Sequence, residues 1–549
     1  MEEVLTRFPG VGEKIFNQLD DQNLTKCKEV NRSHRKFLEE TKLLWMRMLK
    51  KYNANNVEFK DTWKLVMEKV PLQNFKELAI AVEQFYSIRP HRLAHQHSPH
   101  HIAAERGCLT LCKFIAEKTR LLNPARADGM TGFHFAAQEG HFDVCQYFID
   151  NLDDKNPKEK EGRTPLLSAS IKGHFEIVKL IVENQSVRNP THGSCGRTLL
   201  HSVAFAGHPD VFKYIAQGLQ DVNPSDLNGT TPLHFAAMNG DLEVVKYIVD
   251  KIKDKNPSNN NGCTPLDIAT RNGDFKVFKY MAAFVSNLNF TNAEGSTLLH
   301  LAASKGHIEI VKYITGIVSV KNPYNNVTEH VGEATPLHNA ARNGHLEVYK
   351  CIADQVSDKN PDGDITGTPL HVAASEGHLE IVKYITGILS DKNPTQDDRS
   401  DRTTPLHYAA KNGHLEVYKY IAAQVNNKNP VETECGTTAL HYAAENGHID
   451  VVRYILKFIA DANLKDDKGM TPKNKSAQQG YYKICKILID HGADPNPIND
   501  EGTSAIDIAG INAPGSSQEI RDLILRNRKK IKLQNFEKKT KLSYESESD

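Results

Sequence analysis

Histidine is the residue whose number and spacing most suggest chemistry, because it fills 25 of the 549 positions. Imidazole nitrogens bind metals, carry protons and form hydrogen bonds. One regular series takes the fourth place of a repeated Thr-Pro-Leu-His phrase: His101, His134, His201, His234, His300, His338, His371, His407 and His441. In a second series, each histidine directly follows a glycine and lies seven residues after the fourth place of the phrase: His141, His174, His208, His307, His345, His378, His414 and His448.

A denser group of histidines precedes the regular series and could bind a metal. It consists of His91, His95, His97, His100 and His101. The group lacks an acidic or thiolate partner nearby. We therefore expect no metal site and no cofactor.

Catalytic motifs are absent from the chain. The sequence contains no G-x-S-x-G, no G-x-x-x-x-G-K-[ST] and no H-E-x-x-H. The nine cysteines are scattered without a C-x-x-C, which disfavours a disulfide scaffold or a zinc ribbon and favours a reducing compartment. Cys108 and Cys112 lie one helical turn apart, as small core residues do. We expect a binding protein without catalytic residues.

The overall composition excludes further classes. Hydrophobic residues make up 39% of the chain, the mean hydropathy is −0.50, and no apolar run is long enough to span a membrane. Lys and Arg (68) balance Asp and Glu (68), which disfavours a general binder of nucleic acid or membranes. Met1-Glu2-Glu3 begins no signal peptide. We expect a cytoplasmic or nuclear protein with protein partners.

The Thr-Pro-Leu-His phrase recurs in thirteen copies, mostly 33 residues apart. In the copy at residue 231, Thr231 can cap a helix, Pro232 suits its first position, and Gly240 can end it. A second amphipathic helix follows, with Leu242, Val245 and Ile248 on one face. One such unit cannot bury its apolar face alone, whereas stacked copies can.

A 33-residue period with T-P-L-H-x-A resembles the ankyrin-repeat family over residues 91–512. The resemblance implies an all-α solenoid of about thirteen helix-turn-helix units with β-hairpin-like fingers, in which the regular histidines hydrogen-bond backbone and neighbouring fingers. Leu167 and Asp267 replace the histidine in two copies. Lys473 replaces a buried leucine, which predicts a loose unit, and the weak last copy at Thr503 predicts a cap.

The segment of residues 1–50 follows a different pattern. It contains Phe8-Pro9, then Ile15-Phe16-x-x-Leu19, then Asn23-Leu24-x-x-Cys27-x-x-Val30, and closes with Leu44-Trp45. This order and spacing resemble an F-box. The resemblance implies docking onto the adaptor subunit of a cullin-RING ubiquitin ligase through Phe8, Pro9, Ile15, Phe16, Leu19, Leu24 and Val30. Alternatively, the segment is a helical cap on the first repeat. We interpret residues 51–90 as a helical connector.

A partner of a repeat array binds its concave face, which loop fingers and first helices build. Our candidates on this face are Phe235, Met238, Arg271, Arg342, Asn343, Tyr408, Lys411, Tyr442 and Glu445. The aromatic candidates could instead fill the interfaces between repeats. Two longer spacings predict extended fingers at Pro323–Ala334 and Pro394–Thr403, which are either binding loops or neutral insertions.

The tail of residues 513–549 is basic over Arg526–Lys532 and ends in Glu545-Ser546-Glu547-Ser548-Asp549. Such a basic run is a nuclear-import signal, a nucleic-acid patch or a solvated helix end. The acidic end predicts disorder. Taken together, the sequence predicts a non-catalytic subunit of an SCF-type ubiquitin ligase that recruits a target through its repeats. The alternative is an ankyrin scaffold without a ligase role.

Overall fold

The computed structural model describes residues 99–546, except residues 293, 326–333, 364–366, 396–401 and 434. The F-box-like segment, with its predicted adaptor-binding residues, and the connector lie outside the described residues. The chain divides into two compact units, Met1–Ile268 (unit 1) and Ala269–Asp549 (unit 2). Each unit is described by itself.

Unit 1 consists of paired short helices, each pair formed by a first and a second helix. The first helices are α7 (Pro99–Glu105), α9 (Gly132–Glu139), α11 (Pro165–Lys172), α13 (Leu199–Ala206) and α15 (Pro232–Asn239). The second helices are α8 (Leu109–Thr119), α10 (Phe142–Asn151), α12 (Phe175–Glu183), α14 (Pro209–Ala216) and α16 (Leu242–Lys251). The unit boundary falls inside the next first helix, α17 (Pro265–Asn272).

Unit 2 continues the same pairing. Its other first helices are α19 (Leu298–Lys305), α21 (Pro336–Arg342), α23 (Pro369–Glu376), α25 (Pro405–Lys411), α27 (Ala439–Glu445) and α29 (Pro472–Gln478). Its second helices are α18 (Phe275–Ala282), α20 (Ile308–Ile317), α22 (Leu346–Ala353), α24 (Leu379–Ile388), α26 (Leu415–Gln424), α28 (Ile449–Ile455) and α30 (Tyr482–Asp490).

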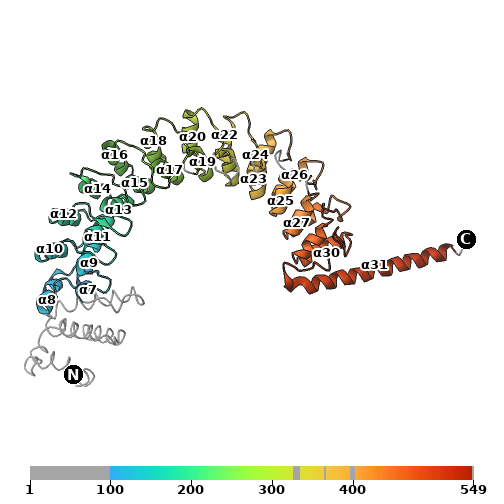
Figure 1. The fold of residues 1–549 in the computed structure, drawn as a ribbon, viewed down its shortest axis with the longest axis horizontal. Helices are drawn as coiled ribbons and strands as arrows, with labels where there is room; N and C mark the ends of the chain where they lie inside the picture. The colour runs from blue at the N-terminus through green and yellow to red at the C-terminus, as the bar shows by residue number, and fades with distance from the viewer. Residues whose placement is uncertain are drawn as a thin grey trace, which may run out of the picture. The chain divides into compact units, whose positions relative to one another are not determined.

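The first and second helices form two layers within each unit, as Figure 1 shows for α19 and α23 beside α20, α22 and α24. Successive first helices pack against each other, and so do successive second helices. Their facing side chains are small or apolar and fully buried, as Ala236, Ala237 and Val245 are in α15 and α16. This stacking buries the face that one repeat alone would expose.

Helix ends follow the predicted signals. In α15, Thr231 precedes the helix in an extended conformation, Pro232 is its first residue, and Gly240 ends it with φ 75°. This left-handed φ suits glycine, which has no Cβ to clash with the backbone. The predicted helix-turn-helix unit is confirmed here.

Strands are few. The described residues hold one sheet, in which β1 (Thr191–His192) pairs antiparallel with β2 (Arg197–Thr198). Four other loops have one isolated bridge each. The two long loops fall where insertions were predicted, between α20 and α21 and between α24 and α25. Residues 326–333 and 396–401 of these loops lie outside the described part.

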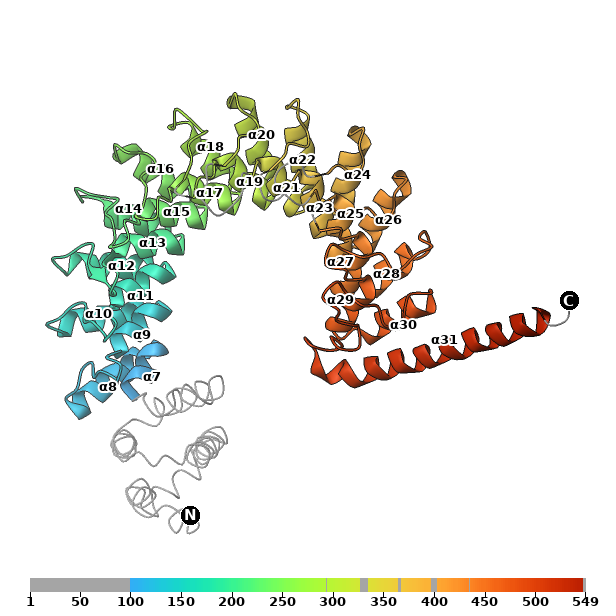
Figure 2. The same ribbon diagram turned by 45° about the vertical axis from the view of Figure 1, so that its right-hand side comes forward.

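The thirteenth copy of the phrase does not form a helix pair. Residues 505–510 make turns, and after the short η1 (Pro514–Ser516) the long helix α31 (Ser517–Ser546) follows. Ala505, Ala509, Ile520 and Ile524 are buried in one cluster that closes the end of the stack. Within unit 2, α31 then extends past the last helix pair (Figure 2) as far as Ser546, so it includes the first two of the five residues predicted to be disordered, and the other three lie outside the described residues.

The copy with Lys473, predicted to be loose, forms the regular helix α29. Asn474 takes the histidine place, and its Oδ1 accepts a hydrogen bond of 3.0 Å from the amide of Thr471. The Lys473 side chain is fully buried, and its ammonium donates to the carbonyl oxygen of Pro495. Burial lowers the pKa of Lys473 to about 8. The lysine stem therefore fills the leucine site, and a backbone carbonyl satisfies its charge.

Candidate protein-binding surface

The histidines at the fourth place of the phrase, here called the capping histidines, join the repeats that contain them to the following loop. In α15 the amide of Thr231 donates to Nδ1 of His234 (3.1 Å), and Nε2 of His234 donates to the carbonyl oxygen of Cys263 (3.1 Å). All nine capping histidines make this second bond, at 2.9–3.2 Å. Burial lowers the pKa of each, which keeps the rings neutral at pH 7.

The second series, here called the bridging histidines, joins the repeats that contain it to the preceding ones. Nε2 of His208 donates to the carbonyl oxygen of Ile171 (2.9 Å), and Nε2 of His414 to that of Ser375 (2.8 Å). All eight bridging histidines use the carbonyl of the eighth residue of the preceding phrase, at 2.8–3.2 Å. A structural role for the regular histidines is thus visible in both units.

No metal centre is formed by the dense histidine group as far as it is described. His100 and His101 are buried, and their Nε2 atoms lie 3.0 Å from the carbonyl oxygens of Leu121 and Pro124. Burial lowers the pKa of both to about 4. In the described residues no three His, Cys, Asp or Glu side chains could hold a metal. His91, His95 and His97 lie outside that part.

The aromatic candidates fill spaces between repeats. Phe235 is 7% exposed, and its ring is covered by the Arg197 guanidinium, 4.8 Å from the centroid. Tyr408 packs edge-on against His371, and Tyr442 packs edge-on against His407. The sequence left packing open as the alternative for these three side chains, and their geometry agrees with it.

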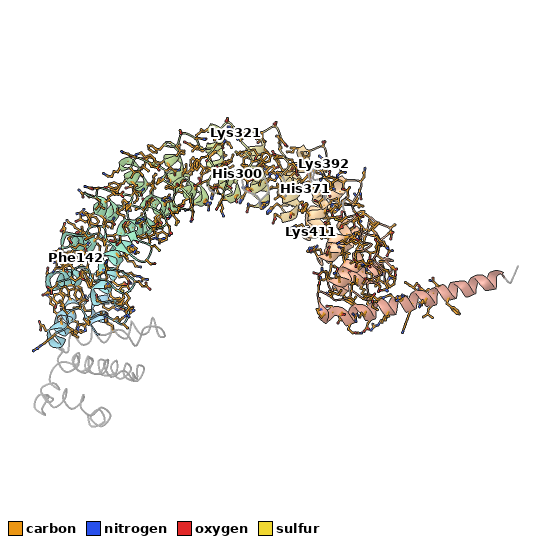
Figure 3. The ribbon with its side chains drawn as sticks, viewed as in Figure 1. Phe142, His300, Lys321, His371, Lys392 and Lys411 are labelled. Carbon is orange, nitrogen blue, oxygen red and sulfur yellow. The ribbon has the colours of Figure 1, made fainter. Side chains whose placement is uncertain are left out.

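The remaining candidates lie at or beside the eighth place of the phrase, on the free edge of the first-helix layer. Met238 is 44% exposed, and Lys411 and Asn343 are exposed. Figure 3 shows Lys411 on this edge of unit 2 and Lys321 on the opposite edge, beyond the second helices. Arg271, Arg342 and Glu445 are partly exposed; Arg271 pairs with Glu294 (3.2 Å) and Glu445 with Lys475 (3.7 Å).

Two exposed side chains of unit 1 share the eighth place with Met238 but were missed in the sequence. Ile171 of α11 is 42% exposed, and Phe205 of α13 is 57% exposed. The three form an apolar row across the adjacent first helices α11, α13 and α15. The signal was available, since an alignment of the copies by their threonines places all three residues in one column.

A groove of about 970 Å³ lies beside the start of this row. Its walls are the loop that contains Lys158–Arg163, the face of α11, and the β-hairpin of Thr191–Ser194. Lys158, Lys160, Arg163 and Lys172 line the groove together with Glu161. The groove therefore presents more positive than negative groups beside an apolar side chain, Ile171.

Comparison with known proteins decides the family. The family model described as "Ankyrin repeats (3 copies)" matches overlapping segments that together cover residues 100–466. The chain belongs to the ankyrin-repeat family. Ankyrin repeats bind other proteins, so this chain is a protein-binding protein, and the apolar row and the groove are features that single repeats add to the shared frame.

Two curated relatives match a short part of the chain. Protein phosphatase 1 regulatory subunit 12A of Rattus norvegicus is 34% identical over 83 residues, which is 15% of this chain and 7% of the relative. The same subunit of Mus musculus is 34% identical over 61 residues, 11% of this chain and 6% of the relative. The match thus spans less than a tenth of either relative's length.

None of the helices in the described ranges has the length and apolar character to cross a membrane.

Proposed function

We propose that this chain is a substrate-recruiting F-box subunit of an SCF-type ubiquitin ligase. Its ankyrin repeats bind a target protein, and residues 1–50 attach to the adaptor and, through it, to the cullin. The observation that carries target binding is the exposed apolar row of Ile171, Phe205 and Met238. Attachment to the ligase rests on the F-box resemblance of residues 1–50.

In this role the chain performs no chemistry. The repeats hold the target close to an enzyme that carries ubiquitin as a thioester, and proximity raises the rate of transfer. The neutral, hydrogen-bonded histidines suit this function, because they stabilise a fixed surface. Side chains on the free edge of the first helices then select the target.

The test is co-purification of the tagged full-length chain from cells. We expect the adaptor and the cullin to be recovered with the wild type, and to be lost when Pro9→Ala is combined with Phe16→Ala. The matched control is Phe205→Ser with Met238→Ser, which alters the repeats and should leave adaptor recovery unchanged. Adaptor recovery that is absent with the wild type, or unaffected by the double change at Pro9 and Phe16, would contradict the ligase assignment.

An ankyrin scaffold without a ligase role is the second candidate. The described repeats support this candidate as much as the first, because both candidates use the repeats to bind a protein. It predicts that the proteins recovered with the wild type exclude adaptor and cullin, and depend on Phe205 and Met238 but not on Pro9 and Phe16. The same co-purification therefore separates the two candidates.

A further inference from the structure

The repeat that begins at Thr164 departs from the others where the groove lies. Leu167 stands in the capping-histidine place, so no imidazole connects α11 to the following loop. That loop is one residue longer than in a 33-residue copy and forms the hairpin of β1 and β2. Leu167 and Ser168 line the groove together with Thr191 and His192. Loss of the connecting ring thus coincides with an open space between helix and finger.

The positive charges of the groove are mostly unused by the protein itself. Glu161 pairs with Arg163 at 2.8 Å. Glu159 is buried, and its Oε1 accepts from the amides of residues 161 and 163 at 2.9 and 2.8 Å. Lys158, Lys160 and Lys172 are exposed and form no ion pair within the described residues. Three ammonium groups therefore face one opening without carboxylate partners.

The apolar row continues from this opening along the unit. Ile171 lines the groove, and Phe205 and Met238 occupy the same place on the next two first helices. Packed helices lie about 8–10 Å apart, so the row spans on the order of 20 Å. Phe205 packs edge-on against the buried Phe235, with ring centroids 6.0 Å apart, which holds it in position. A row of this length can receive two or three large side chains of one bound segment.

We infer that unit 1 binds an acidic linear segment of a partner protein that carries large apolar side chains. The carboxylates of the segment pair with Lys158, Lys160 and Lys172, and its apolar side chains cover Ile171, Phe205 and Met238. Nucleic acid is disfavoured because it would leave the apolar row without a partner and would place phosphates beside Glu161. This inference rests on the proposed function, of which it names the class of target.

The test begins with selection of a random-peptide library displayed on phage against the full-length chain. We expect the enriched peptides to combine Asp or Glu with Leu, Phe, Ile or Met. One enriched peptide, labelled with a fluorophore, is then titrated by anisotropy. Phe205→Ser and Lys172→Glu should each weaken its binding about tenfold or more. Added salt should weaken it further, because surface charge pairs are screened.

Matched controls come from the same places of the repeat in unit 2. Ser304→Ala corresponds to Phe205→Ser, and Lys305→Glu corresponds to Lys172→Glu. Both should leave the dissociation constant within about twofold of the wild type. Circular dichroism of every variant checks that the repeats remain folded.

The inference would be overturned by enrichment of basic or uncharged peptides, by no enrichment, or by binding that depends on Ser304 and Lys305 instead. Competition by a DNA duplex or by phosphatidylserine vesicles that depends on Lys172 but not on Phe205 would assign the groove to anions in general, and would also overturn it. The ligase proposal predicts that adaptor recovery depends on Pro9 and Phe16, which are not part of the proposed peptide-binding surface. The ligase assignment can therefore fail while peptide binding holds, and peptide binding can fail while the ligase assignment holds.

Discussion

The two units use one frame and present different side chains on it. At the eighth place of the phrase, three adjacent copies of unit 1 have the exposed apolar residues Ile171, Phe205 and Met238, while its first two described copies have Glu105 and Gln138. Unit 2 has polar or charged residues there, namely Arg271, Ser304, Arg342, Ser375, Lys411, Glu445 and Gln478. Where the following repeat has a bridging histidine, the backbone carbonyl at this place accepts its bond in both units, for example at Ile171 and at Ser375. Asp241 and Asp274 stand in the bridging-histidine place of the repeats that follow Phe205 and Met238.

This difference teaches how the repeats separate structure from binding. The hydrogen bond between neighbouring repeats needs only the carbonyl oxygen of the eighth residue, so its side chain is free to vary. Buried places such as those of Ala236 and Ala237 vary much less, because the other described helix pairs have only Ala, Ser, Thr or Val there. Binding chemistry is therefore expected where a repeat gives its backbone to the frame and its side chain to solvent.

The largest expected effect is the destabilisation of the stacked repeats of both units at low pH. In unit 2 burial lowers the pKa of His300, His338, His371, His407 and His441 to about 4. Unfolded histidine has a pKa near 6.5, so between these values the unfolded chain binds more protons than the folded chain. The free energy of unfolding therefore falls as the pH decreases from about 6.5 to about 4.

Hydrogen exchange at about pH 7.5 and about pH 5, corrected for intrinsic rates, measures this effect repeat by repeat. Protection should decrease in both units. The decrease should be larger in α19–α27, because Leu167 and Asp267 replace two capping histidines of unit 1. Equal protection at the two pH values would contradict neutral, hydrogen-bonded rings.

The next largest effect is expected where one bridging histidine, His414, packs against Gly377 of the preceding repeat. Gly377 has φ +81°, and a Cβ added there would lie 2.5 Å from Nδ1 of His414. Gly377→Ala should therefore lower the free energy of unfolding by about 2–4 kcal/mol in urea titrations. Gly387→Ala is the control, since an added Cβ there meets nothing within 4 Å and lies in helix α24. We expect Gly387→Ala to raise the free energy of unfolding by about 0.5–1 kcal/mol. Equal effects of the two changes would contradict a close contact between Gly377 and His414.

A smaller effect is expected at the buried Lys473, whose replacement should stabilise the stacked repeats of unit 2. Its pKa of about 8 lies below the 10.5 of a free lysine, so burial of the ammonium lowers the free energy of unfolding. This penalty is fully present below about pH 8, where the lysine is charged in both the folded and the unfolded chain. Lys473→Met should raise the free energy of unfolding at pH 7 by about 1–3 kcal/mol. The exposed Lys468→Met should change it little. A destabilised Lys473→Met would show that the bond to Pro495 outweighs the burial.

Much of the frame could be predicted from the sequence because its signals are local. Thr231, Pro232 and Gly240 mark the ends of α15 through their own backbone preferences, and the same types recur in the other copies. The thirteenth copy was predicted as a weak cap, but the length of α31 was not. No periodic apolar face marks that helix beyond Ile524, so its extent could not be anticipated.

The candidate surface was only partly predictable. Phe235, Tyr408 and Tyr442 were singled out as aromatic residues, yet their exposure depends on the preceding repeat, whose Arg197, His371 and His407 side chains pack against their rings. Met238 was found, whereas Ile171 and Phe205 at the same place were not. The groove depends on a loop conformation that Leu167 and one additional residue allow, and no local signal specifies it. The F-box-like segment lies outside the described residues and stays a prediction.

The most direct test of the central claim is the hydrogen-exchange footprint of an enriched acidic peptide on the full-length chain. The account predicts that binding increases protection in α11, α13 and α15 and in the loops of residues 158–163 and 191–197, and leaves α21–α27 unchanged. Protection confined to α21–α27, or no protection in either unit, would contradict the claim that the apolar row and its lysines form the binding surface.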